Sequence, residues 1–153
     1  MTRNKWIFFD LDGTLANLYA VENWLPKLEA ADPSPYREAA PLLNLSALAR
    51  QLNTLRRKGY RIGIISWTSK SGTVAYNEEV KIAKLEWLAK HLPSVTWDEI
   101  NIVDYGTNKW EVAGRKGILF DDELKNLESW GNGLAWYPSY ISEILSNCNK
   151  LAA

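Results

Sequence analysis

Two aspartates, one residue apart, follow a short apolar run near the start of the chain. The apolar run is Trp6-Ile-Phe-Phe9, and the chain continues Asp10-Leu-Asp12-Gly13-Thr14. A buried strand that ends in this way presents two carboxylates at its carboxyl end, which is where open α/β sheets bind ligands. Because close carboxylates repel each other, we expect them to share a cation, and Mg²⁺ prefers oxygen ligands of this kind. The alternative is that both aspartates merely cap a turn, since Asp-Gly is a common turn dipeptide.

Two further segments carry groups that could take part in the same chemistry. Residues 117–120 are another short apolar run, and Asp121 and Asp122 follow it directly. The apolar run 60–66 leads into a polar loop, residues 66–73, with the sequence Ser-Trp-Thr-Ser-Lys-Ser-Gly-Thr. Hydroxyls and backbone N–H groups of such a loop can hold the oxygens of a phosphate group. The alternative for the loop is an ordinary solvated turn.

The first segment resembles motif I of the haloacid dehalogenase superfamily, Asp-x-Asp-Gly-Thr after an apolar strand. This resemblance implies that Asp10 is the nucleophile and Asp12 the general acid/base of a phosphoryl transfer. Motif II of the family is a Ser or Thr at the end of the second strand, a position that Ser66 matches. Thr68 is the alternative if that strand runs longer. The candidate substrate-binding residues are Gly13, Thr14, Trp67 and Thr68.

The other motifs of the superfamily also have counterparts in the chain. Motif IV is an apolar strand followed by Asp-Asp, which Asp121 and Asp122 match. Lys109, about a dozen residues upstream, matches the lysine of motif III; Lys81 and Lys84 compete for this role, but we expect their helix to present them to water. The resemblance implies one Mg²⁺ ion, with Asp122 either a direct ligand or an orienting residue. The expected metal-binding residues are Asp10, Asp12 (through its backbone carbonyl), Asp121 and Asp122.

Predicted strands alternate with predicted helices along the chain. The strands are expected at residues 5–9, 60–66, 98–103, 117–120 and 134–137, and the longer helices at 46–58, 78–92 and 141–151. This alternation predicts an α/β fold, a three-layer α/β/α sandwich with a parallel sheet. The superfamily resemblance implies a Rossmann-like core with strand order 5-4-1-2-3.

We expect residues 1–153 to form one domain, because 153 residues suit a single hydrophobic core. Residues 17–42 are expected to form a small helical cap insert within it, over the strand ends. This segment contains several prolines and two short stretches with helical character. It would act as a lid that excludes water, or it would simply pack against the core.

The composition limits the classes of partner. Lys plus Arg equals Asp plus Glu at 18 each, so the chain gives no strong nucleic-acid signal. Cys148 is the single cysteine, which excludes an internal disulfide and fits a reducing compartment. No early apolar segment approaches a signal peptide or membrane span, so we expect a cytoplasmic protein without a membrane partner.

Within the superfamily, two segments are similar to the 5′(3′)-deoxyribonucleotidase branch. One is Lys84-Leu-Glu-Trp-Leu-Ala-Lys-His-Leu-Pro, and the other is Lys109 followed by Ile118-Leu-Phe-Asp-Asp. The resemblance implies a Mg²⁺-dependent phosphomonoester hydrolase that acts on a small nucleotide through an aspartyl-phosphate. The alternatives are a phosphatase for a sugar phosphate or a nucleic-acid end, and a non-catalytic module that binds metal or phosphate.

Overall fold

The computed structural model describes residues 5–152, and its centre is a parallel five-stranded sheet. The strands are β1 (Trp6–Phe9), β2 (Arg61–Trp67), β3 (Glu99–Val103), β4 (Ile118–Phe120) and β5 (Ala135–Trp136). Their order across the sheet is β3-β2-β1-β4-β5, which read from the other edge is the predicted order 5-4-1-2-3. β1 therefore pairs with β4 on one side and with β2 on the other, and the predicted topology is confirmed.

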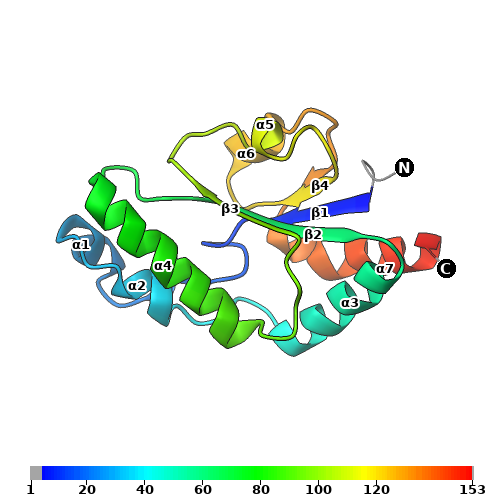
Figure 1. Ribbon diagram of the computed structural model, residues 1–153, viewed down its shortest axis with the longest axis horizontal. Helices are drawn as coiled ribbons and strands as arrows, with labels where there is room; N and C mark the ends of the chain where they lie inside the picture. The colour runs from blue at the N-terminus through cyan, green and yellow to red at the C-terminus, as the bar shows by residue number, and fades with distance from the viewer. Residues whose placement is uncertain (1–4, 153) are drawn as a thin grey trace.

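Helices cover both faces of the sheet, as Figure 1 shows: α5 and α6 lie on one face, and α3, α4 and α7 on the other. The helices are α1 (Trp24–Glu29), α2 (Ser34–Glu38), α3 (Leu45–Arg57), α4 (Val74–His91), α5 (Lys109–Val112), α6 (Leu124–Glu128) and α7 (Ile141–Ala152), with 3₁₀ turns η2 (Leu18–Ala20) and η3 (Pro138–Tyr140). The three-layer α/β/α prediction is confirmed. Within residues 5–152, none of these helices combines the length and apolar character needed to span a bilayer.

The central strands are apolar because both of their faces are buried. Ile7 and Phe9 point into the core beside α3 and α7, and Phe8 points into the smaller core beside α5. Gly63 of β2 makes room for this second core, because a Cβ at that position would lie 2.7 Å from the ring of Phe8. The strand that precedes Asp10 is therefore fixed from both sides of the sheet.

The two long helices on the α4 face begin at different residues from those predicted. α3 has Asn44 as its N-cap, and the Asn44 side chain accepts a hydrogen bond from the backbone N–H of Ala47 at 3.0 Å. The helix therefore begins at Leu45, one residue before the predicted start at residue 46. α4 begins at Val74, four residues before the predicted start, because the Thr73 hydroxyl accepts from the N–H of Tyr76 and caps it there.

Residues 17–42 contain the two short helices that the sequence predicted, α1 and α2. Leu18 and Tyr36 from this segment form a buried cluster with Tyr76, Val80 and Ala83 of α4. Figure 1 shows α1 and α2 beside the N-terminal end of α4. The segment is therefore anchored on α4, next to the carboxyl ends of the strands.

Candidate active site

Asp10 and Asp121 lie side by side because their strands are paired in register. Phe9 of β1 is opposite Phe120 of β4, and the N–H of Asp10 donates to the carbonyl oxygen of Phe120 at 2.9 Å. Asp10 is 7 % exposed and Asp121 is fully buried. The two acidic segments identified in the sequence therefore form one site at the carboxyl edge of the sheet, where parallel sheets bind ligands.

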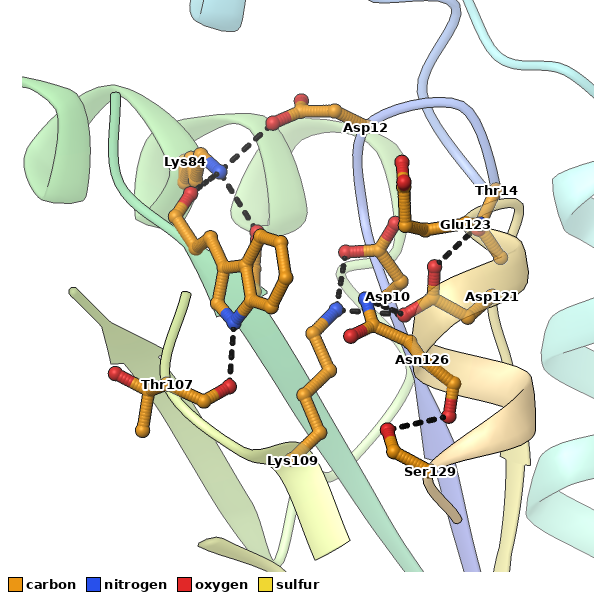
Figure 2. A network of polar contacts seen from close by, with 12 residues as sticks. Asp10, Asp12, Thr14, Lys84, Thr107, Lys109, Asp121, Glu123, Asn126 and Ser129 are labelled. Atoms are coloured by element: carbon orange, nitrogen blue, oxygen red, sulfur yellow. Dashed lines mark hydrogen bonds and ion pairs between the residues drawn. The ribbon is translucent and has the colours of Figure 1, made fainter. Parts of the chain in front are cut away.

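Lys109 lies between these two carboxylates (Figure 2). Its Nζ atom is 2.9 Å from Asp10 Oδ1 and 2.7 Å from Asp121 Oδ2. Lys109 is the first residue of α5, and the Asn108 side chain caps this helix by accepting from the N–H of Glu111. Burial by itself would lower the pKa of Lys109, but the adjacent charges of Asp10 and Asp121 outweigh it and raise the pKa above its usual value.

Asp10, Asp121 and Asp122 form a group that could hold a metal ion. Each can offer a carboxylate oxygen, and these three oxygens lie within 4.8 Å of one another. Burial and the nearby charge of Asp10 raise the pKa of Asp121 to about 6 and that of Asp122 to about 8. Three carboxylates and the single positive charge of Lys109 leave two negative charges when all are ionised, so the donor set and its charge fit a divalent cation such as Mg²⁺.

Two features fix the positions of Asp121 and Asp122, the two acids that follow β4. Asp121 accepts hydrogen bonds from the N–H of Glu123 (2.9 Å) and from the Asn126 side chain (3.1 Å). Gly13 has φ +82°, and a Cβ there would lie 2.1 Å from Oδ2 of Asp122. Gly13 is therefore needed both for its left-handed backbone and for the space that Asp122 occupies. Asn126 was not among the predicted site residues.

The Asp12 carboxylate lies outside this group and pairs with a second buried lysine. Asp12 Oδ2 is 2.7 Å from Nζ of Lys84, a fully buried residue of α4. The expectation that this helix presents Lys84 to water was wrong. Burial raises the pKa of Asp12 by more than Lys84 lowers it. Lys81 is half-exposed and pairs with Glu78 at 3.3 Å rather than with one of the aspartates.

The hydroxyls of Ser66 and Thr68 occupy different positions at the end of β2. The strand runs one residue beyond Ser66, and the N–H of Thr68 still bonds to the carbonyl of Val103 on β3. Ser66 is fully buried, and its hydroxyl accepts from Lys84 Nζ at 2.7 Å. The Thr68 hydroxyl is buried and has no hydrogen-bond partner within residues 5–152. Both residues line the same cavity.

Thr14 and Trp67, two of the predicted substrate-binding residues, contact the acids and Lys109. The hydroxyl of Thr14 donates to Asp10 Oδ2 at 3.4 Å. The ring of Trp67 lies 5.3 Å from Lys109 Nζ, and its indole N–H donates to the carbonyl of Thr107 at 2.9 Å. Trp67 therefore forms one wall beside the lysine and is itself held in place.

A cavity of about 660 Å³ opens in front of these groups. Its floor contains Asp10, Asp12, Lys109, Asp121 and Asp122. Its walls are the loop after β2, from residue 66 to residue 73, and the segment that carries α1 and α2. From that segment the lining includes the aromatic and apolar residues Tyr19, Trp24, Leu25, Leu28 and Tyr36. The cavity has the size and mixed lining of a small-molecule site.

Comparisons with known proteins give a structural likeness only. No protein-family model matches the chain, and no curated protein matches it significantly. Eight chains of solved structures match. One is the crystal structure of D,D-heptose 1,7-bisphosphate phosphatase from Burkholderia thailandensis, with a TM-score of 0.50 and 17% sequence identity over 86% of this chain and 75% of that chain. At this identity the match shows a shared fold, a Rossmann-like parallel sheet between two layers of helices.

Proposed function

We propose that the protein is a Mg²⁺-dependent phosphomonoester hydrolase that acts through an aspartyl-phosphate on Asp10. The observation that carries this proposal is the convergence of Asp10, Asp121 and Asp122 around Lys109 at one edge of the sheet. A carboxylate is an established nucleophile toward phosphorus, and a lysine with a divalent cation offsets the charge of a phosphate dianion. The residues of motifs I, III and IV are thus assigned to one reaction centre.

The residues expected to hold Mg²⁺ are Asp10, Asp121 and Asp122, with Asp12 contributing its backbone carbonyl. A bound Mg²⁺ would supply positive charge to the phosphate oxygens and help align them with the nucleophile. The side chain of Asp12 is paired with Lys84 and is left out of this set.

The reaction takes two steps, and both Asp10 and Asp12 take part in each of them. In the first, a carboxylate oxygen of Asp10 attacks phosphorus, the bond from phosphorus to the ester oxygen breaks, and Asp12 gives its proton to that oxygen. In the second, Asp12 takes a proton from water, the water oxygen attacks phosphorus, and the bond to Asp10 breaks. Inorganic phosphate leaves, Asp10 is again a carboxylate, and Asp12 is again protonated.

Lys109 and Thr68 are assigned to the oxygens of the transferring phosphate. Lys109 donates a hydrogen bond to the carboxylate of Asp10, so its ammonium group lies within reach of a phosphate that is attached to Asp10. The geometry favours Thr68 over Ser66, because the Thr68 hydroxyl lacks a partner within residues 5–152 whereas the Ser66 hydroxyl is bonded to Lys84. Thr14 keeps Asp10 oriented through its hydroxyl.

We assign the segment from residue 17 to residue 42 to a cap that contacts the alcohol part of the substrate. Tyr19 and Trp24 from this segment line the cavity, and their rings are in edge-to-face contact at 5.0 Å between centroids. Aromatic walls favour a flat leaving group, which supports a small nucleotide as the substrate. A sugar phosphate is the second candidate, since the matching solved structure is a heptose bisphosphate phosphatase.

The experiment is phosphate release from a panel of nucleoside monophosphates, sugar phosphates, a 5′-phosphorylated oligonucleotide and an aryl phosphate, each with Mg²⁺ and with chelator. The proposal predicts turnover that chelator abolishes, with the highest kcat/KM on nucleoside monophosphates. A preference for sugar phosphates or for the oligonucleotide would keep the chemistry and change the substrate. Absence of turnover with every ester, while Mg²⁺ still binds, would favour the non-catalytic metal-binding module.

The matched variants are Asp10→Asn and Asp104→Asn. Asp10→Asn removes the nucleophile and is expected to lower kcat by a factor of about 10⁴ or more while the fold is kept. Asp104 is an exposed acid just after β3 and does not line this cavity, so Asp104→Asn should leave turnover unchanged. Activity retained in Asp10→Asn would contradict the assignment of the nucleophile.

A further inference from the structure

Lys84 is a buried charge that the reaction scheme above does not use. It is fully buried in α4, and its Nζ atom has three polar neighbours: Asp12 Oδ2 at 2.7 Å, Ser66 Oγ at 2.7 Å and the carbonyl oxygen of Trp67 at 2.6 Å. An ammonium group has three N–H bonds, so these neighbours account for all of them. The ring of Tyr36 lies 5.0 Å from the same nitrogen and closes the remaining side.

These contacts argue against a direct role of Lys84 in binding the phosphate. Each N–H bond already has an acceptor, and none points to open space in the cavity. Lys84 joins three elements at one point: α4, the end of β2 and the loop that follows β1. Burying a lysine costs free energy unless its charge is paired and its N–H bonds have acceptors. The role of Lys84 is therefore expected to concern the carboxylate with which it pairs, Asp12.

The two oxygens of Asp12 are in unequal surroundings. Oδ2 is held by Lys84, whereas Oδ1 is buried and has no hydrogen-bond partner within the described residues. Asp12 also lines the cavity in front of Asp10. Oδ1 is therefore an acceptor that the described residues leave without a donor, on a side chain that lines the cavity.

We propose that Lys84 is a positioning residue that holds Asp12 by Oδ2 and leaves Oδ1 to exchange the proton with the leaving oxygen and then with water. This inference rests on the proposed function, because it assigns a role to Lys84 within that reaction. It also separates the tasks of the two buried lysines. Lys109 stabilises the nucleophile and the phosphate, and Lys84 orients the acid.

The consequence is a dependence on the leaving group. An alkyl alkoxide is a poor leaving group and needs a proton as the P–O bond breaks, whereas 4-nitrophenolate leaves without one. Loss of Lys84 should therefore slow alkyl phosphates far more than 4-nitrophenyl phosphate. A residue that merely supported the fold would slow both to the same extent.

The test measures kcat/KM of wild type, Lys84→Met and Asp12→Asn on a series from 4-nitrophenyl phosphate through phenyl phosphate to an alkyl phosphate. We expect Lys84→Met to lose about 10²–10³ in kcat/KM on the alkyl ester and less than about tenfold on the nitrophenyl ester. Asp12→Asn should show the same pattern. The double variant should lose little more than Asp12→Asn alone, because both changes act on one group.

Two further variants complete the design. Lys84→Gln keeps N–H donors toward Asp12 and should fall between wild type and Lys84→Met, which also provides a second test if Lys84→Met folds poorly. Lys90→Met changes an exposed lysine of the same helix that does not line the cavity and should leave the whole series unchanged.

The outcomes separate the inference from the proposed function. A wild type inactive on every ester would overturn the proposed function and the role of Lys84 with it. An active wild type whose Lys84 variants lose the same factor on all esters would overturn the inference alone. Additive losses in the double variant would do the same.

Discussion

Replacing Asp122 by Asn should stabilise the metal-free protein and remove its response to Mg²⁺. Carboxylate oxygens of Asp10, Asp121 and Asp122 lie within 4.8 Å of one another. At that distance and an effective dielectric constant of about 20, two unit charges repel by about 3.5 kcal/mol. Asp122 takes part in two such pairs when it is ionised, and below its raised pKa of about 8 it avoids them only by taking up a proton that it does not carry in the unfolded chain. Asn removes either cost, although Lys109 and solvent offset part of it. We expect a net gain of about 1–3 kcal/mol in the free energy of unfolding, or about 3–10 °C in Tm.

The assay is thermal unfolding in chelator and across a Mg²⁺ titration. A ligand at 100 times its Kd stabilises the folded state by about 2.7 kcal/mol, so wild type should gain several degrees with Mg²⁺ whereas Asp122→Asn should gain little. Asp104→Asn, which removes an exposed acid, should behave as wild type. The reasoning is refuted if Asp122→Asn unfolds at a lower temperature than wild type in chelator, or if its Mg²⁺ response equals that of wild type.

Two other predictions concern the backbone of the site and the acid stability of the fold. Gly13→Ala and Gly133→Ala both place Ala at positive φ and should each cost about 1–2 kcal/mol, but only Gly13→Ala puts a Cβ 2.1 Å from an Asp122 oxygen and should lose the Mg²⁺ response in the same titration. For Asp98, burial would raise the pKa, but the hydrogen bonds and charge of Arg56 outweigh it and lower the pKa, so its contribution to stability is present above pH 4 and is lost as pH falls through the lowered value. Asp98→Asn should therefore flatten the loss of stability between about pH 5 and pH 2 in denaturant titrations, and an unchanged pH profile would contradict this.

The fold and the acidic group could be predicted because they depend on local sequence. Apolar runs that end in paired aspartates mark β1 and β4, and the topology then brings Asp10 and Asp121 together. The end of β2 was predicted one residue short, at Ser66. Trp67 lies between the polar residues Ser66 and Thr68 and was therefore assigned to the loop, although it continues the strand. Because the strand continues through Trp67, Thr68 follows its last residue, and the Thr68 hydroxyl has no hydrogen-bond partner within residues 5–152. Ser66 lies within the strand, and its hydroxyl accepts from Lys84.

The environment of Lys84 could not be predicted from residue type, because lysines are seldom fully buried. A signal was nevertheless present: Val80, Lys84 and Leu88 are four residues apart and share one face of α4, which is the buried face. Ile82 lies off that face and is exposed. Asn126 gave no signal, since its contact with Asp121 depends on how α6 folds back after β4.

The central claim is that Asp10 carries the phosphoryl group, and trapping that group tests it most directly. Wild-type protein would be mixed with Mg²⁺ and excess substrate, quenched in acid within milliseconds and reduced with borohydride, which converts an aspartyl-phosphate to homoserine. The account predicts homoserine at position 10 in the peptide mass spectrum, absent without substrate and absent in Asp10→Asn. Rapid turnover with unmodified Asp10, or with homoserine at another aspartate such as Asp12 or Asp121, would contradict it.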